Sequence, residues 1–255
     1  MKLMIKLRTA AVVCIALAVV LFGMLPDVSR ADDKTPSPTW PEKGGVDFQV
    51  SYGKGGLVIG QARYSWAHDG QKYRKQLALQ TTGVVAVVHK LDYVQTSQGS
   101  IGENGLTPVR FDVAHQGKAP EMALFDWNGE SGARVSIRRG ERERHNLELT
   151  PGDQDVLSIW RQIGHVDTLP DSLLIVANKS ARRARIVKLE EVEVSVPAGR
   201  FMTRHFSARS EDGRLKIDLW LANTHHRIPV RAILGDDKSD TLVLEATAIR
   251  IPSSD

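Results

Sequence analysis

The chain has 255 residues, of which 42% are hydrophobic, and its 34 Lys and Arg residues outnumber its 30 Asp and Glu residues for a formal charge of +4. Four of the basic residues and one acid fall within residues 1–31, so this segment carries +3 and the rest of the chain carries +1. A nearly neutral surface provides no broad field for a polyanion, which excludes general nucleic-acid binding. The apolar content also excludes intrinsic disorder.

The first 31 residues have the layout of a secretory signal peptide. A short basic stretch, Met1 to Arg8, precedes seventeen residues without charge, Thr9 to Leu25. Pro26 then interrupts the apolar run, and Ser29-Arg30-Ala31 offers small residues at a cleavage site. This layout predicts cleavage after Ala31 and a periplasmic protein. The alternative is a membrane anchor formed by an uncleaved N-terminal helix, because seventeen residues approach the length that spans a bilayer.

Cleavage after Ala31 would also remove the single cysteine, Cys14. The remaining 224 residues would then have no disulfide, no thiolate metal ligand and no cysteine nucleophile. Residues 32–45 are rich in proline and charge and predict an extended lead-in. Residues 46–251 predict a single β-rich domain.

Hydrophobic and polar residues alternate from Val46 onward, which is typical of strands with one buried face. Val46, Phe48 and Val50 share one face, and Asp47 and Gln49 share the other. Turns that contain Gly or Asn separate the alternating runs, as tight hairpin connections require. The runs comprise residues 57–68, 73–81, 109–113, 123–127, 135–137 and 147–149, and then 173–176, 184–196, 200–210, 214–222, 231–234 and 241–251.

One segment, Pro151 to Gly164, breaks this alternation with apolar residues spaced by three and four. The spacing predicts an amphipathic helix of about ten residues that begins near Asp153 or Asp155 and ends at Gly164. We expect this helix to pack on one side of a sheet or in the end of a barrel. About a dozen short strands with one helix predict an all-β, mainly antiparallel fold, a strongly curved sheet or an open or closed β-barrel.

Three motifs in the second half of the chain are informative as an ordered set. They are residues 155–161 (DVLSIWR), residues 196–201 (VPAGRF), and residues 219–223 (LWLAN) followed by 227–231 (RIPVR). Together they resemble the exported bacterial proteins grouped as the domain-of-unknown-function family numbered 3108, over about residues 45–251. Asn223 stands where that family usually has Asp, and Trp160 near a position that is more often Tyr. The resemblance implies an exported, β-rich fold and no specific chemistry.

Two prolines in these motifs predict local structure by themselves. Pro197 and Gly199 predict a turn between two strands. Pro229 cannot donate a backbone hydrogen bond, so it must lie at a sheet edge or at the start of a strand. Arg227 and Arg231 flank Pro229, and either they pair with an acid on a neighbouring strand or they face an anionic ligand.

Aromatic residues are the main candidates for a binding site. In an incompletely closed sheet, some of them would line an apolar concavity of the kind that β-rich carriers use for lipids and other apolar ligands. The candidates for this lining are Tyr64, Trp66, Phe111, Phe125, Trp127, Trp160, Phe206 and Trp220.

The sequence predicts no catalytic residue, no metal ligand and no cofactor. His225 and His226 are adjacent, which fits a solvated turn better than a metal site, although a loop could bring both of them to His205.

A hydrolase is a distant third interpretation. Ser158, His165 and Asp167 could in principle form a triad, but the chain has no G-x-S-x-G elbow. Glu191 and Glu193 share one strand face and fit a solvated surface better than a glycosidase site.

We therefore expect an exported, non-enzymatic protein that binds an apolar or amphipathic component of the cell envelope, such as a lipid, inside its concavity. The alternative is an envelope scaffold or interaction module that docks to a protein partner through an exposed strand edge. Nucleic acid is not an expected partner.

Overall fold

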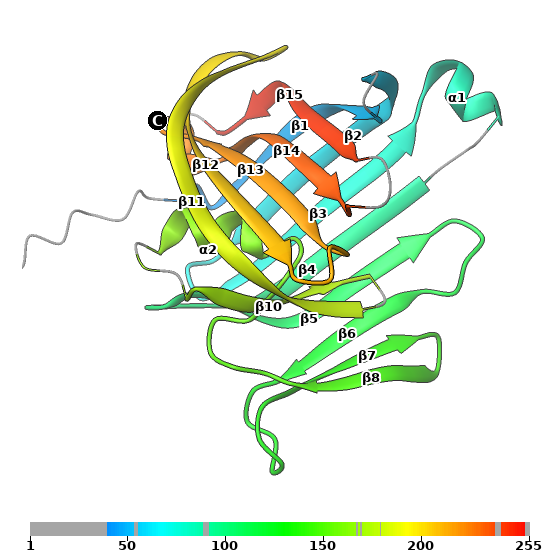
Figure 1. The fold of residues 1–255 in the computed structure, drawn as a ribbon, viewed down its shortest axis with the longest axis vertical. Helices are drawn as coiled ribbons and strands as arrows, with labels where there is room; N and C mark the ends of the chain where they lie inside the picture. The colour runs from blue at the N-terminus through cyan, green and yellow to red at the C-terminus, as the bar shows by residue number, and fades with distance from the viewer. Residues whose placement is uncertain are drawn as a thin grey trace, which may run out of the picture. The chain divides into compact units, whose positions relative to one another are not determined.

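In the computed structural model, residues 40–53, 56–88, 92–166, 168, 170–178, 180–237 and 241–252 are described. The strands of this part of the chain form one sheet in which β1 (Lys43–Tyr52) lies between β2 (Leu57–His68) and β15 (Leu242–Arg250). Strands from the two ends of the described chain are therefore neighbours (Figure 1). The predicted signal peptide, Cys14 and most of the lead-in lie outside the described residues.

From β1 the chain meanders outward strand by strand to β8, and from β9 it returns inward to β15. Neighbouring strands are antiparallel except for β9 and β10, which are parallel. The outward arm contains β3 (Lys72–Thr81), α1 (Gly83–Val88), β4 (Asp92–Gly102), β5 (Gly105–His115), β6 (Glu121–Asp126), β7 (Arg134–Arg139) and β8 (Arg142–Glu148). The returning arm contains β9 (Gln154–Asp155), α2 (Ile159–His165), β10 (Ser172–Ala177), β11 (Ser180–Val196), β12 (Gly199–Ser210), β13 (Lys216–Ala222), the 3-10 turn η1 (His225–Arg227) and β14 (Pro229–Gly235).

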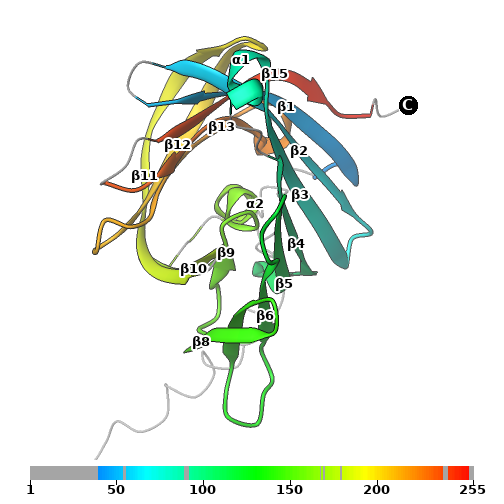
Figure 2. The ribbon, with the colours of Figure 1, turned by 90° about the vertical axis from the view of Figure 1, so that its right-hand side faces the viewer.

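The sheet is strongly curved, and α2 lies inside the curve, facing β11–β13 on one side and β2–β5 on the other (Figure 2). Side chains of β1 and β2 on the concave face pack against this helix. Trp160 of α2 contacts Phe48 edge to face, with ring centroids 6.5 Å apart, and contacts Tyr64 at 5.3 Å. The predicted all-β, mainly antiparallel fold with a strongly curved sheet is therefore confirmed, and the predicted helix fills its interior.

Two glutamines connect α2 and β9 to the start of β5. Gln154 donates from Nε2 to the carbonyl oxygen of Leu106 at 2.9 Å. Gln162 accepts from the Leu106 N–H at 2.7 Å and donates to the carbonyl oxygen of Asn104 at 2.8 Å. Gly105 allows this close approach, because a Cβ atom there would overlap Gln162 Oε1. Side chains thus connect the two arms of the sheet at this point.

The helix is shorter than the sequence predicts, with seven residues and a start at Ile159. The preceding residues form β9 and a turn. Asp155 causes the turn, because its Oδ1 accepts the N–H groups of Leu157 at 2.8 Å and Ser158 at 2.7 Å. A carboxylate that binds nearby backbone N–H groups in this way competes with helix formation.

The predictions for the two prolines are confirmed. Pro197 lies in the turn between β11 and β12, where Gly199 has a φ of 137°. Pro229 is the first residue of β14, a position that requires no ladder donor from it. Among the described residues, no helix has both the length and the hydropathy needed to cross a membrane.

Candidate functional site

A cavity of about 290 Å³ lies between α2 and the concave face of β11–β13, and we call it the α2 cavity. Alternation along the strands determines its lining, because Lys188 of β11 pairs with Phe206 of β12, and Arg204 of β12 pairs with Leu221 of β13. The cavity is lined by Ile163, Gly164, Val166, Thr168, Ile186, Lys188, Arg204, Phe206, Leu221 and Arg227.

The floor of the α2 cavity is apolar. Ile163, Ile186 and Phe206 also line a second, smaller void of about 10 Å³. A void of that size is close to the minimum for one water molecule, and an apolar lining of this kind stays dry. The cavity thus adjoins unfilled apolar space deeper under the sheet.

Cationic side chains are concentrated at the same cavity. Lys188 is exposed, and Arg204 forms an ion pair with Glu191 at 3.2 Å between Nε and Oε1. Arg227 donates from Nη1 to the carbonyl oxygen of Gly164 at 2.9 Å, so the end of α2 positions it. Three cations and one ion-paired acid give this region a net positive charge.

The turn η1 next to the cavity is strained. His225, His226 and Arg227 have φ values of 57°, 60° and 55°, a left-handed conformation that costs a non-glycine residue roughly 1–2 kcal/mol. α2 holds the turn, because Arg161 donates from Nη1 to the carbonyl oxygen of His226 at 2.9 Å. Strain of this kind is concentrated at ligand clamps and active sites.

Asn223, which departs from the family motif, contacts Glu191. It donates from Nδ2 to Glu191 Oε2 at 2.9 Å, while Arg204 binds the other carboxylate oxygen. An aspartate at position 223 would place two carboxylates against each other. The amide is therefore the residue that fits beside Glu191 in this chain.

A second polar cluster lies deeper in the interior, around Lys75 of β3. The side chain of Lys75 is fully buried between Trp66 and Ser97 on the neighbouring strands. Its Nζ lies 5.2 Å from the ring centroid of Trp40 and 5.5 Å from that of Tyr73. Within the described part of the chain, this Nζ has no hydrogen-bond partner.

Asp155 is the acid of this cluster, and it is also fully buried. Ser97 donates from Oγ to Asp155 Oδ2 at 2.6 Å, and the hydroxyl of Tyr73 lies 3.2 Å from Ser97 Oγ. These three side chains form a continuous hydrogen-bonded chain from β3 through β4 to β9.

Burial shifts the pKa values of the charged groups in this cluster. It lowers the pKa of Lys75 well below the ordinary range; the neighbouring Arg161 lowers it further, and Asp155 opposes the shift. Burial raises the pKa of the Asp155 carboxyl against the effect of its hydrogen bonds. It also lowers the pKa of Arg161 to about 10. The direction is the same in each case, toward the uncharged form.

The structure places the eight aromatic candidates in three settings. Phe206 lines the α2 cavity. Trp220 lies on the outer face, where it stacks on His205 with ring centroids 4.1 Å apart. The other six lie in the hydrophobic core or pack against it, as Phe206 and Trp220 also do: Tyr64, Trp66, Phe111, Phe125, Trp127 and Trp160.

The two candidate arginines are separated. Arg227 lines the α2 cavity, whereas Arg231 lies over the ring of Trp220 at 5.2 Å and pairs with Glu245 at 3.6 Å. Arg231 thus shows the cross-strand pairing that was the alternative to an anionic ligand.

The structure also shows the surroundings of the residues considered for a hydrolase or a metal site. Ser158 is buried, and its Oγ accepts the N–H of Asp155 at 3.0 Å. His165 ends α2 and Asp167 lies outside the described residues. His205 faces Asp218 at 3.4 Å. His225 contacts Thr224 at 2.8 Å in the exposed turn.

Sequence reasoning missed Ile186, Lys188, Arg204 and Leu221 as cavity residues, and it missed Lys75. A signal for Lys75 was present, because alternation places it on the same face as Tyr73 and Leu77. No comparable signal identified the cavity residues, since their grouping depends on where α2 packs.

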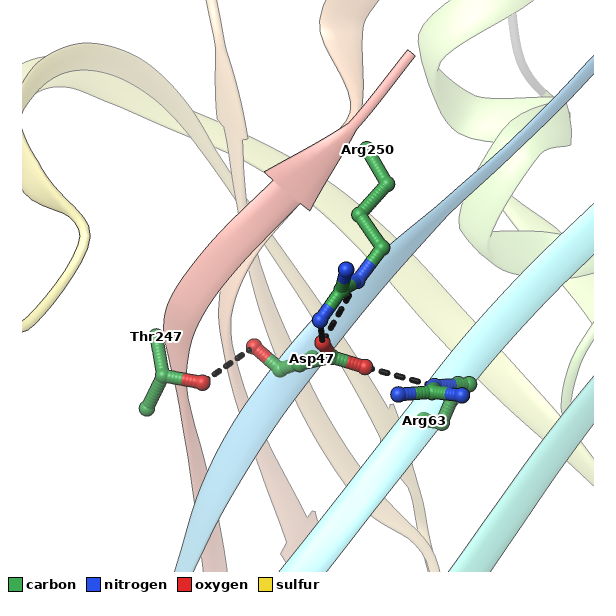
Figure 3. A network of polar contacts seen from close by, with 4 residues as sticks. All are labelled: Asp47, Arg63, Thr247 and Arg250. Carbon is green, nitrogen blue, oxygen red and sulfur yellow. Dashed lines mark hydrogen bonds and ion pairs between the residues drawn. The ribbon is translucent and has the colours of Figure 1, made fainter.

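Another hollow, of about 490 Å³, lies on the outer face over β15 and β1–β3. There Asp47 accepts hydrogen bonds from Arg63 Nε and Arg250 Nε, both at 2.7 Å, and Thr247 donates to its carbonyl oxygen at 3.1 Å (Figure 3). Burial alone would raise the pKa of Asp47, but the two guanidinium groups outweigh it and hold the pKa below its ordinary value. Because both guanidinium groups bind Asp47, we interpret this network as a structural link between β1 and its neighbours β2 and β15.

The chain is similar to solved structures at low sequence identity, and the first of them supports the fold. A β-barrel-like protein of the domain of unknown function DUF1849 from Brucella abortus is 10% identical, with a TM-score of 0.54, over 85% of this chain and all of that chain. A putative exported protein with a YmcC-like fold from Bacteroides fragilis is 9% identical, over 83% of this chain and 97% of that chain, with a TM-score of 0.36. A putative lipoprotein from Parabacteroides distasonis is 11% identical, over 83% and 96%, with a TM-score of 0.27.

A comparison with the curated proteins finds no match. The family model described as a protein of unknown function, DUF3108, matches residues 47–247. The match covers the motifs at residues 155–161, 196–201 and 219–231, and it extends from β1 to β15. The match therefore confirms the resemblance that those motifs indicated, and the chain belongs to the DUF3108 family.

Proposed function

We propose that this protein is a non-enzymatic binder of an amphipathic anion, such as a lipid or fatty acid with an acidic head group, and that the α2 cavity is the binding site. The observation that carries this proposal is the combination of an apolar floor, formed by Ile163, Ile186 and Phe206, with cations at the same cavity. An apolar chain would bury surface against the floor. The acidic group would then lie near Lys188 and Arg227.

The size of the cavity limits the ligand. Small-molecule sites usually have volumes of roughly 300–1,000 Å³. At about 290 Å³, the α2 cavity would enclose one short acyl chain or the end of a longer one. The remainder of a larger lipid would stay outside, beside the cations and the strained turn η1.

Calorimetric titration of the purified protein with three probes of similar alkyl chain length tests the proposal. The probes are decanoate, decan-1-ol and decyltrimethylammonium, which differ in charge. We expect decanoate to bind at least about tenfold more tightly than decan-1-ol, which corresponds to about 1.4 kcal/mol, and the cation to bind most weakly. Equal affinity for all three would contradict the predicted anionic selectivity.

A pair of variants on β11 tests whether the ligand binds in the α2 cavity. Ile186→Trp would fill the cavity, whereas Val187→Trp adds the same side chain at the next residue, on the opposite, outer face of the strand. We expect Ile186→Trp to abolish decanoate binding and Val187→Trp to retain it. Binding that survives Ile186→Trp would place the ligand elsewhere. Native mass spectrometry of the purified protein would then identify any molecule that co-purifies.

We also propose that the protein acts in the periplasm after cleavage behind Ala31. The basic start, the uncharged run from Thr9 to Leu25 and the small-residue site support this location. N-terminal sequencing of the protein from a periplasmic extract would give Asp32 as the first residue. A protein that retains residues 1–31 and fractionates with membranes would support the anchored alternative.

The scaffold alternative is less well supported by the described strand edges. β8 ends the sheet on one side with a charged run that includes Arg142, Glu143 and Arg144, all exposed. Charged edge strands oppose the addition of another strand. On the other side, β9 contains only two residues.

A further inference from the structure

Trp40 covers the buried amine of Lys75 and lies just before the first strand. It precedes β1, so its backbone lies outside the strand ladder. Its ring stacks on His68 with centroids 4.2 Å apart, and its carbonyl oxygen lies 3.1 Å from His68 Nε2. Trp66 Nε1 donates to the carbonyl oxygen of Pro41 at 2.9 Å. Arg161 also lies over the Trp40 ring, 5.0 Å from its centroid, and the ring packs against the hydrophobic core. Because Trp40 precedes the strand, displacing it breaks these contacts while β1 stays paired with β2.

Lys75 differs from an ordinary structural lysine. Its side chain is fully buried, and among the described residues its Nζ has no hydrogen-bond partner. The charged and titratable groups that face it are Asp155 of β9, Arg161 of α2, and Tyr73 of its own strand. Burying an ammonium ion without hydrogen bonds is costly, so burial holds the pKa of this amine well below its ordinary value and favours the uncharged form.

A desolvated lysine next to another cation is the arrangement that activates an amine as a nucleophile. We propose that Lys75 is a nucleophilic amine that condenses with the carbonyl group of a small, apolar aldehyde or ketone, which reaches it when Trp40 is displaced. Trp40 and the aromatic rings around the amine would select an apolar carbonyl compound over a charged one. The proposal does not rest on the α2 cavity, since Lys75 and Trp40 do not line it.

The reaction requires no oxidant, reductant or metal. The lone pair of Nζ forms a bond to the carbonyl carbon, and a proton moves from nitrogen to oxygen. The carbinolamine then loses water, so the C–O bond breaks and a C=N bond forms. The hydroxyl chain from Tyr73 through Ser97 to Asp155 lies beside the amine and can carry protons during these steps. Hydrolysis reverses the reaction.

Reductive labelling of the full chain tests the proposal. The protein is incubated with butanal and sodium cyanoborohydride at several pH values between 6 and 8, and each lysine is quantified by peptide mass spectrometry. Lys72 is the matched control, because it lies on the same strand and is exposed. We expect labelling of Lys72 to rise about tenfold per pH unit, as for an ordinary amine, and labelling of Lys75 to vary much less.

Variants of Trp40 test the access route. Trp40→Ala should raise the labelling rate of Lys75 at least tenfold and leave Lys72 unchanged, and Trp40→Phe should give an intermediate rate. Circular dichroism confirms that each variant is folded. The proposal is overturned if Lys75 stays unlabelled in both variants while Lys72 is fully modified. It is also overturned if Lys75 shows the same pH dependence as Lys72, or if its labelling occurs only on global unfolding in urea.

Discussion

Gln162 of α2 accepts a hydrogen bond from the backbone N–H of Leu106 at 2.7 Å, and both residues are buried. This contact joins the helix in the concavity to the start of β5. Replacement by alanine leaves the Leu106 N–H buried without its partner, which costs about 1–3 kcal/mol. We therefore expect Gln162→Ala to lower the free energy of unfolding by that amount, measured by urea denaturation. Gln116→Ala, at an exposed position, should change it by less than about 0.5 kcal/mol.

Gly105 leaves the space that the side chain of Gln162 occupies in this contact. Its φ is 92°, and a Cβ atom there would also overlap Gln162 Oε1. Gly70 is a matched control, because its φ is 89° and a Cβ atom there would have no neighbour within 4 Å. Both alanine variants incur the backbone strain, but only Gly105→Ala also displaces Gln162. We expect Gly105→Ala to be less stable than Gly70→Ala by at least about 1 kcal/mol, and equal stabilities would contradict the close packing of Gln162.

Lys75 makes stability depend on pH above neutrality. Its folded pKa lies well below 10.5, so between these two values the unfolded chain binds more protons than the folded protein. The free energy of unfolding should therefore rise with pH in that window, by up to about 1.4 kcal/mol per pH unit for one proton. The shift of Asp155 acts at acidic pH and that of Arg161, with a pKa of about 10, acts at higher pH. Urea denaturation at several pH values from 7 to 9.5 isolates the lysine.

Lys75→Met provides the test of this assignment. Methionine removes the buried amine and keeps an unbranched apolar side chain, so the rise with pH should disappear. The variant should also be more stable than the wild type at pH 7, by about 1–3 kcal/mol, because an unsatisfied polar group is lost. Lys43→Met, at an exposed position, should retain the rise. A rise that persists in Lys75→Met would assign it to another group.

The strands and turns could be predicted from the sequence because their signals are local. The alternation of Val46, Phe48 and Val50 appears in β1 as buried residues, and Pro229 begins β14 as its missing donor requires. The predicted start of the helix was wrong for a physical reason. Asp155 was interpreted as an N-terminal helix residue, but its carboxylate binds the N–H groups of Leu157 and Ser158 and holds this segment in a turn.

Most of the candidate site could not be predicted, because it depends on packing between residues that are far apart in the sequence. Phe206 and Arg227 were candidates, but the residues that join them at one cavity come from β11, β13 and α2. Alternation shows which face of a strand is buried and does not show where a helix leaves space above it. Trp160 and Phe206 were both expected to line a cavity, and the helix position places Trp160 in the packed core.

The strain in η1 gives a final prediction. His226 has a φ of 60°, which glycine adopts at little cost and alanine does not. His226→Ala removes the side chain and keeps the strain, whereas His226→Gly removes both, so the difference between the two variants isolates the backbone. We expect His226→Gly to be more stable than His226→Ala by about 1 kcal/mol in urea denaturation. At His145, within strand β8, the order should reverse, because glycine weakens an ordinary strand. If His226→Gly also binds decanoate more weakly than His226→Ala, the strained turn positions Arg227 for the ligand; unchanged affinity would show that it does not.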